Sequence, residues 1–218
     1  MSDIVVYGVL GSPFVRAVQM GLEEKKAAYR VEAVAPKELK SETYLKRHPF
    51  GRVPAFEHGD FRLYETQAIL RYLDRVLPEP ALVPADPRAA ARMDQLIGVT
   101  DCYVVPQISA PISFPRLIAP RFGLPVDEEA VLAAVPAAEN CVAAIAALVG
   151  DRPYLAGDAL SLADLMLIPH LAYFIQCDEG AAILARHPAL TAWIARMDER
   201  DSMAVTAPER LMMPAEAA

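Results

Sequence analysis

The chain has 218 residues, a formal net charge of −7 and 22% charged residues. An acidic chain without a cluster of lysines or arginines is not expected to bind nucleic acid. The N-terminus lacks the basic start and apolar core of a secretory signal, and no apolar run is expected to reach the length of a membrane span. The 3 cysteines form neither a disulfide framework nor a metal motif, and the 4 histidines lack metal-ligand spacing, so we expect a cytoplasmic protein without a metal centre.

The N-terminal part of the chain predicts a β-α-β unit. Residues 4–7 form a short apolar strand. Ser12, followed by proline, has the form of a helix N-cap with proline at the first helical position. A second strand is expected over residues 29–34, and the polar residues 36–47 form a surface segment.

The next stretch predicts two strands joined by a loop. Strand-type residues occupy 53–57 and 61–64, and the residues between them suit a hairpin with a longer loop. Pro54, at the start of a strand, favours a cis peptide bond after Val53. Such a bond would leave the N–H and C=O of Val53 free to pair with a peptide-like ligand.

Two polar residues precede the helix that follows these strands. Thr66 stands where a helix N-cap is expected. The positive end of this helix suits a carboxylate, while Glu65 suits an ammonium group. One ligand with a peptide-like middle and an amino-acid head would use both residues together with Val53.

The second half of the chain contains no predicted strand. Four prolines between residues 78 and 88 predict a linker. A helix over 88–105 is expected to bend or end near Pro106 and Pro111, with a loop marked by later prolines. Further helices are expected from Asp127 with a kink at Pro136, after a capping box at 161–164, and from His187.

Residues 48–73, HPFGRVPAFEHGDFRLYETQAILRYL, resemble the glutathione-binding core of the glutathione S-transferases. The family pattern is roughly N-P-[FA]-G-x-[VI]-P-x-[FL]-x-D/H-G-D-x-x-L-x-E-S-x-A-I-x-x-Y-[IL]. The motifs S-L-A-D at 161–164 and H-P-x-L-x-x-W-x-x-R at 187–196 also match, so the resemblance covers residues 4 to about 200. The chain is most similar to the cytosolic, serine-type members of phi-like and bacterial kind.

This resemblance implies a two-domain fold. An N-terminal α/β thioredoxin-like domain over residues 1–77 would bind glutathione. A linker at 78–88 would lead to an all-α helical bundle over 89–218 that contributes a hydrophobic substrate pocket. The implied activity is that of a glutathione transferase, which uses glutathione as co-substrate and activates its thiol for attack on a small hydrophobic electrophile in detoxification.

Ser12 falls where serine-type members of the family keep their catalytic serine. A hydroxyl at a helix N-terminus can donate a hydrogen bond to the thiolate, and the helix dipole favours the negative charge. Tyr7 is the rival, because other classes use a tyrosine at the end of the first strand, although Tyr7 also suits a packed core position. No cysteine lies near residue 12, which disfavours a mixed-disulfide mechanism.

The resemblance also assigns the residues that hold glutathione. The backbone of Val53 would pair with the cysteinyl unit, and Glu65 with Thr66 would hold the γ-glutamyl head. Leu39 stands where the family has a histidine near the glycyl carboxylate, so one contact to that carboxylate is missing. Arg52 replaces the commoner glutamine, and it either offsets the missing contact or stays solvated. The full set is Lys40, Arg52, Val53, Pro54, Glu65 and Thr66.

An acceptor pocket between the domains and a homodimer complete the expectations. The residues assigned to the pocket are Leu10, Phe14, Tyr103, Gln107 and Phe114, with Arg116 as a further candidate. Phe50 is expected to project into a partner subunit. A glutathione-dependent peroxidase or isomerase could use the same site, and a non-catalytic ligand-binding or scaffold protein could share the fold. The sequence leaves these alternatives open.

Overall fold

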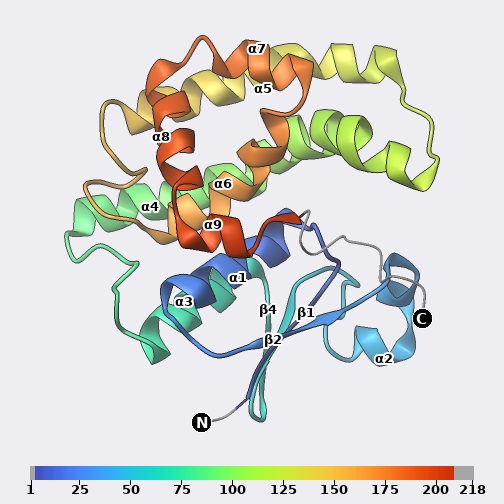
Figure 1. The fold of residues 1–218 in the computed structure, drawn as a ribbon, viewed down its shortest axis with the longest axis vertical. Coiled ribbons are helices and arrows are strands. Elements are labelled where there is room, and N and C mark those ends of the chain that lie inside the picture. The colour runs from blue at the N-terminus through green and yellow to red at the C-terminus, as the bar shows by residue number, and fades with distance from the viewer. Residues whose placement is uncertain (1–2, 209–218) are drawn as a thin grey trace. The chain divides into compact units, whose positions relative to one another are not determined.

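The computed structural model describes residues 3–208, which divide into two compact units (Figure 1). The second unit is Leu82–Met197, and the first unit combines the chain up to Ala81 with the described residues from Asp198 onward. Residues 198–208 thus group with the N-terminal unit, whereas the sequence analysis assigns them to the helical domain. The linker at 78–88 stays a prediction.

The first unit contains a sheet of four strands in the order β2-β1-β3-β4. Its strands are β1 (Ile4–Gly8), β2 (Arg30–Ala33), β3 (Ala55–His58) and β4 (Phe61–Tyr64). Strand β1 runs parallel to β2 and antiparallel to β3, and β3 runs antiparallel to β4. His58 pairs with Phe61, so the hairpin turn is Gly59 and Asp60 alone and is shorter than expected. Gly59 has a φ of 62°, which a tight two-residue turn favours.

Helices α1 (Pro13–Glu24) and α3 (Thr66–Val76) supply the core of this unit. Alternate residues of β1, Ile4 and Val6, point to the same face of the sheet and pack with apolar residues of both helices. The fully buried members of this core are Val6, Val15, Val18, Leu22, Phe56, Ile69 and Leu73. The opposite face of the sheet carries polar residues.

Short helices complete the first unit. Pro36–Lys40 forms the 3₁₀ helix η1, and Glu42–Leu45 forms α2, which is capped by the side chain of Ser41. Helix α9 (Asp201–Val205) packs against α1. The arrangement is the thioredoxin-like fold predicted from the sequence.

The second unit is all-helical, as predicted, but its prolines do not end its first helix. Helix α4 (Pro87–Val99) continues without a break into η2 (Thr100–Ile118), a π-helical stretch that contains Pro106, Pro111 and Pro115. The expected helix end near Pro106 is therefore wrong, whereas a bend there stays a prediction. The loop expected from the later prolines is confined to residues 123–127, because η2 and η3 run through Pro115 and Pro120. Proline lacks the N–H of a regular α-helical bond, and the wider π turn accommodates that loss.

The other helices of this unit follow η2. They are η3 (Ala119–Phe122), α5 (Glu128–Val149), α6 (Leu162–Phe174), α7 (Asp178–Leu184) and α8 (Pro188–Asp198). Both α5 and α6 pack against η2. Asp127 caps α5 by accepting a hydrogen bond from the N–H of Ala130 at 3.0 Å.

Helix α5 is long and apolar enough, by length and composition, to cross a membrane, with a mean hydropathy of 1.8 over its most apolar window. The expectation that no apolar run reaches this length is therefore wrong. The finding is weak as an indication of a membrane span, because core helices pass the same test. Here α5 packs along η2 and buries Val142 and Ile145 completely.

The predicted capping box at the start of α6 is confirmed. The buried carboxylate of Asp164 accepts hydrogen bonds from the N–H of Ser161 at 2.8 Å and from its hydroxyl at 2.7 Å. It also accepts from the N–H of Leu155 at 2.9 Å and from the indole N–H of Trp193 at 2.8 Å. The Asp164 side chain thus joins the start of α6 to α8 and to the loop that precedes α6.

Candidate functional site

The predicted glutathione residues gather at one end of the sheet. Strand β1 ends at Gly8, β3 begins at Ala55 and β4 ends at Tyr64. Ala55 pairs with Tyr7 on one side and with Tyr64 on the other, so the end of β1, the start of β3 and the end of β4 lie side by side. Ser12 follows the end of β1, Val53 precedes the start of β3 and Glu65 follows the end of β4. The topology therefore brings together residues that are about fifty positions apart in the chain.

A tight turn carries the chain from β1 to Ser12. A Cβ on Gly8 would lie 2.3 Å from a methyl carbon of Val15, so only glycine allows α1 to approach the strand this closely. Gly11 has a φ of 84°, which favours glycine. Ser12 then occupies the N-cap position of α1, where its C=O accepts the first helical hydrogen bond from Arg16 at 2.9 Å.

The side chain of Ser12 does not cap its own helix. It is half-buried, and its hydroxyl makes no capping hydrogen bond to the backbone of α1. The first turn of α1 also lacks an acidic residue, so no side chain there neutralises the positive end of the helix dipole. A free hydroxyl beside an uncompensated helix N-terminus can stabilise an anion such as a thiolate.

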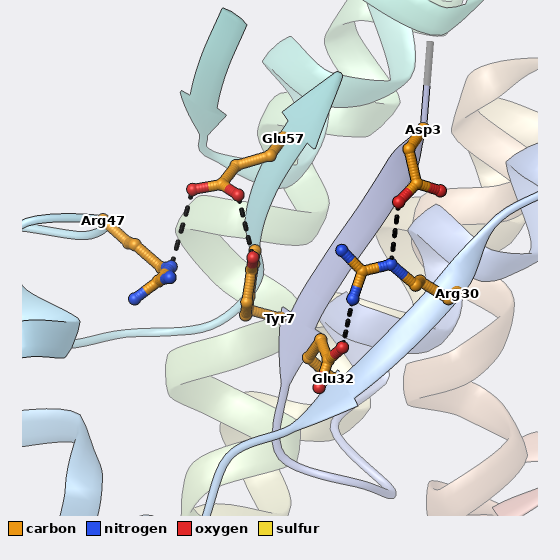
Figure 2. Close-up of polar contacts among 6 residues, drawn as sticks. All are labelled: Asp3, Tyr7, Arg30, Glu32, Arg47 and Glu57. Atoms are coloured by element: carbon orange, nitrogen blue, oxygen red, sulfur yellow. Dashed lines mark hydrogen bonds and ion pairs between the residues drawn. The ribbon is translucent and has the colours of Figure 1, made fainter. Parts of the chain in front are cut away.

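Tyr7 is the alternative candidate for thiol activation. Its hydroxyl is hydrogen-bonded to Glu57 on the polar face of the sheet (Figure 2). This hydroxyl donates a 2.8 Å hydrogen bond to the Glu57 carboxylate, and the Arg47 guanidinium lies 4.5 Å from the ring centroid. Burial and the neighbouring Glu57 carboxylate raise the pKa of Tyr7. Glu57 also pairs with Arg62 at 3.1 Å. Tyr7 is thus a member of an ionic network on this face of the sheet, and Ser12 stays the predicted residue for thiol activation.

The loop before β3 has the geometry expected of a peptide-binding segment. The peptide bond between Val53 and Pro54 is cis, as predicted. Val53 lies outside the ladder of β3, which begins at Ala55, so its backbone groups take no part in the sheet. The Tyr44 hydroxyl supports the loop by donating to the C=O of Arg52 at 2.8 Å.

Lys40 reaches the same loop from η1. Gly51 has a φ of 59°, and a Cβ placed on it would lie 3.2 Å from the Lys40 ammonium nitrogen and 2.7 Å from the C=O of Leu39. The glycine therefore allows η1 to approach the loop. Lys40 and Arg52 are both exposed, so both cations are accessible to a ligand at this edge.

Glu65, and not Thr66, is the N-cap of α3. Thr66 is the first helical residue and is 5% exposed, whereas Glu65 is exposed and has a φ of 71°. A non-glycine residue at positive φ carries backbone strain, and such residues cluster at ligand-binding sites. The expectation of Thr66 as N-cap is wrong because the chain turns sharply at Glu65 before the helix begins.

His48 lies beside the predicted site, although the sequence analysis mentions it only among the histidines that lack metal-ligand spacing. It is 2% exposed, and its ring lies 4.8 Å from that of Tyr64 between centroids. Burial lowers the pKa of His48, while the Glu65 carboxylate raises it and the Arg52 guanidinium lowers it further. His48 therefore lies within the electrostatic reach of two predicted glutathione residues. His48 stands directly before Pro49-Phe50-Gly51, where the family pattern has asparagine. This place in the motif was the sequence signal that could have placed His48 near the site.

The acceptor residues fall in different units. Leu10 and Phe14 belong to the first unit, and the other three belong to η2 in the second unit, so a common pocket stays a prediction. Within the second unit, Tyr103 and Gln107 line a cavity of about 410 Å³ together with residues of α4 and α5. Phe114 is 47% exposed. Arg116 is held by ion pairs to Glu128 at 2.7 Å and Glu179 at 2.5 Å, which indicates a structural role.

The three cysteines are not among the predicted glutathione residues, although Cys141 lines the cavity beside Tyr103. Over residues 3–208, no group of histidine, cysteine, aspartate or glutamate side chains could hold a metal ion. Cys102, Cys141 and Cys177 are free thiols and all lie in the second unit.

Comparisons with known proteins agree with this geometry. Residues 2–75 match the N-terminal domain model of the glutathione S-transferases, and residues 128–196 match the C-terminal domain model. A rice protein, probable glutathione S-transferase GSTF1, is 33% identical over 96% of this chain and 99% of its own length.

Solved structures are also similar. Glutathione transferase F7 from Populus trichocarpa has a TM-score of 0.84 and 27% identity, covering 94% of this chain and 97% of its own. Maize glutathione S-transferase I, solved with an atrazine–glutathione conjugate, has a TM-score of 0.83 and 31% identity, covering 98% of this chain and all of its own. The family and fold expected from the sequence are confirmed, and this chain is a member of the glutathione S-transferase family.

Proposed function

We propose that Ser12 activates the glutathione thiol for attack on a small hydrophobic electrophile. The hydroxyl of Ser12 donates a hydrogen bond to the sulfur, and the N-terminus of α1 favours the thiolate over the thiol. The thiolate then attacks an electrophilic carbon: a sulfur–carbon bond forms, the leaving group departs with its bonding electrons, and the thiol proton passes to solvent. The observation that carries this proposal is the half-buried Ser12 hydroxyl, which caps nothing at the start of α1.

The other predicted residues hold the tripeptide. The N–H and C=O of Val53 pair with the cysteinyl unit, and the Glu65 carboxylate binds the ammonium group of the γ-glutamyl head. The N-terminus of α3, with Thr66, receives the head's carboxylate. Lys40 binds the glycyl carboxylate, and Arg52 adds a second cation in place of the missing family histidine. The convergence of these residues at one end of the sheet supports the assignment.

The experiment is a calorimetric titration of the protein with reduced glutathione, with thiolate ultraviolet absorbance followed in parallel. One charge-assisted hydrogen bond contributes about 1.5–3 kcal/mol, so Ser12→Ala should raise the thiol pKa in the complex by about 1–2 units. Ser12→Thr keeps a hydroxyl and serves as the control. Binding that yields no thiolate in the native protein, or an unchanged thiol pKa in Ser12→Ala, would remove Ser12 from the mechanism.

The same titration bears on the alternatives. A thiolate that reduces peroxides or isomerises a substrate would use the same site, and activity measurements with aryl halides and peroxides separate these reactions. A scaffold protein has no need of a glutathione site. Failure to bind glutathione at millimolar concentration would therefore favour the scaffold function for this member of the family.

We further propose that the protein is a cytoplasmic homodimer. Phe50 is 64% exposed at the tip of the loop before Val53, which is an unusual place for a large apolar side chain. The cavity beside Tyr103 in the second unit offers a partner copy an apolar seat for this ring. Phe50→Ser should shift the protein toward monomers in sedimentation experiments. A Phe50→Ser protein that stays dimeric would exclude this contact.

A further inference from the structure

The two cations predicted to bind the glycyl carboxylate lie on residues 36–52, which we name the η1–α2 segment. This segment lies between β2 and β3 in the chain, and both Lys40 and Arg52 are exposed on it. Val53 and Glu65, by contrast, lie directly beside the strands β3 and β4. The placement of Lys40 and Arg52 therefore depends on how the η1–α2 segment is held against the sheet.

The η1–α2 segment has little apolar core of its own. Of its residues, only Tyr44, His48 and Gly51 are buried. Among the described elements, η1 and α2 pack mainly on each other. A segment with few buried apolar contacts opens easily unless particular side chains hold it. Individual side-chain contacts with the sheet consequently decide where the segment lies.

Arg47 supplies such a contact. Its Nε atom lies 3.5 Å from the Glu57 carboxylate of β3, and its Cζ atom lies 4.5 Å from the ring centroid of Tyr7 on β1 (Figure 2). The Nε atom is buried and, within residues 3–208, has no hydrogen-bond partner. The Glu57 carboxylate and the face of the Tyr7 ring therefore compensate the guanidinium charge. One side chain of the η1–α2 segment thus contacts two strands of the sheet.

The carboxylate that receives Arg47 is itself held by the sheet. The Tyr7 hydroxyl donates to Oε2 of Glu57 at 2.8 Å, and Nε of Arg62 on β4 lies 3.1 Å from Oε1. The side chain of Glu57 is 17% exposed, whereas that of Arg62 is 63% exposed. Arg47 and Arg62 thus share one carboxylate, but Arg62 belongs to the sheet and Arg47 to the η1–α2 segment. A comparison of the two arginines separates attachment of the segment from the charge balance of the network.

We propose that Arg47 is a positioning residue that holds the η1–α2 segment on the sheet and so places Lys40 and Arg52 for the glycyl carboxylate. The inference rests on the proposed function, in which these two cations bind that carboxylate of glutathione. With Arg47 in place the cations are preorganised, so binding does not have to order the segment. Without Arg47, part of the binding free energy of the carboxylate is spent on that ordering. The γ-glutamyl head and the cysteinyl unit bind beside the strands and keep their affinity.

Calorimetric titrations of the full-length protein with glutathione and with its glycyl ethyl ester test this role. The ester lacks the glycyl negative charge, so the ratio of the two affinities reports the cations that bind it. We expect the native protein to bind glutathione at least tenfold more tightly than the ester. Arg47→Met should weaken the binding of glutathione at least fivefold and that of the ester less than twofold. Arg62→Met removes the same charge from the same carboxylate and should change both affinities less than twofold.

Glu57→Gln separates positioning from direct attraction between Arg47 and the ligand. This variant keeps the Arg47 charge but removes the carboxylate that holds it. Positioning predicts that Glu57→Gln weakens the binding of glutathione at least threefold. Direct attraction predicts binding at least as tight as in the native protein, because a negative charge near the glycyl carboxylate has been removed.

The affinity for the ester also reports whether each variant is folded. An ester affinity within twofold of the native value in Arg47→Met and Glu57→Gln, together with weaker binding of glutathione, supports the role of Arg47. A loss shared equally by glutathione and the ester, equal effects of Arg47→Met and Arg62→Met, or glutathione binding by Glu57→Gln as tight as in the native protein would overturn it. Failure of the native protein to bind either ligand would instead overturn the proposed function.

Discussion

The buried guanidinium of Arg16 donates a 3.0 Å hydrogen bond to the backbone C=O of Met203, which lies 187 positions later in the chain. Arg16 stands one turn after Ser12 in α1, and its Nε also donates to the Thr206 hydroxyl at 3.4 Å. At the other end of the same helix, Arg200 bonds the Glu24 carboxylate at 2.6 Å. Helix α1, which carries the candidate catalytic serine, is therefore held in place by α9.

Arg16→Ala should destabilise the first unit. Arg16 is 7% exposed, and its removal leaves the C=O of Met203 without its charged donor, so the loss should be about 2–3 kcal/mol. Urea unfolding measures it. The matched control is Arg92→Ala, which removes only an exposed bond to Gln95 and should cost less than about 0.5 kcal/mol. Equal losses in the two variants would contradict the role of Arg16.

Tyr7→Phe separates the two candidates for thiol activation. The hydroxyl of Tyr7 serves Glu57, so its removal should lower the free energy of unfolding by about 1 kcal/mol and leave the glutathione thiol pKa unchanged. Thiolate absorbance in the glutathione complex reports the second quantity. A thiol pKa that rises in Tyr7→Phe as in Ser12→Ala would return Tyr7 to the mechanism.

Glu65→Gly should stabilise the fold and weaken glutathione binding. Glycine accepts the φ of 71° without strain, so the free energy of unfolding should rise by about 1 kcal/mol. Loss of the carboxylate should raise KM for glutathione at least tenfold. Glu65→Gln keeps the strain and removes the charge, so it should raise KM without gaining stability. A Glu65→Gly variant that is less stable than the native protein would show that the backbone is not strained there.

Asp164→Ala should destabilise the second unit severely. The carboxylate accepts four hydrogen bonds in a fully buried position, and their loss leaves four donors without an acceptor. A cost of about 3–5 kcal/mol is expected. Asp158→Ala, at an exposed position in the preceding loop, is the control and should cost less than about 0.5 kcal/mol. Trp193 is the only tryptophan and is fully buried, so its fluorescence reports the unfolding.

Stability should fall in mild acid because of His170. Burial lowers the pKa of this histidine to about 4, and its Nδ1 lies 2.8 Å from the Ser109 hydroxyl. In the unfolded chain its pKa is about 6.5, so the unfolded state binds the extra proton first as the pH falls from 6.5 to 4. The free energy of unfolding should drop by about 3 kcal/mol across this range. His170→Gln should remove most of that slope, and an unaltered slope would assign it to other groups.

Much of the fold was predictable because its signals are local. Pro54 at a strand start predicted the cis bond that the structure has, and Ser161 with Asp164 predicted the cap of α6. Val53 comes just before β3, and Glu65 and Thr66 come just after β4. The start of β3 and the end of β4 are neighbours in a hairpin, so the order of the strands predicted that these residues lie together. The N-cap position of Ser12 before Pro13 is confirmed, while its catalytic role, which rests on the resemblance to serine-type members of the family, stays a prediction.

The errors arise where tertiary structure overrides a local rule. Pro106 ends an ordinary helix, but here packing of η2 against α5 and α6 stabilises a wider turn that tolerates it. The residue type of His48 carries no local signal of a site, and only the fold brings its ring 4.8 Å from that of Tyr64, in a tilted arrangement, with Arg52 and Glu65 near it. The bond between Arg16 and Met203 joins residues 187 positions apart, and no pattern within a sequence window reports such a contact.

The same bond has a consequence for biosynthesis. A ribosome delivers the sheet and α1 early, yet the residues that hold α1 in place, Met203 and Thr206, are made only after the whole helical unit. The helical unit between them has emerged by then. The N-terminal unit therefore cannot form its contacts with α9 until the helical unit has been synthesised, in contrast to domains that fold in order from the N-terminus.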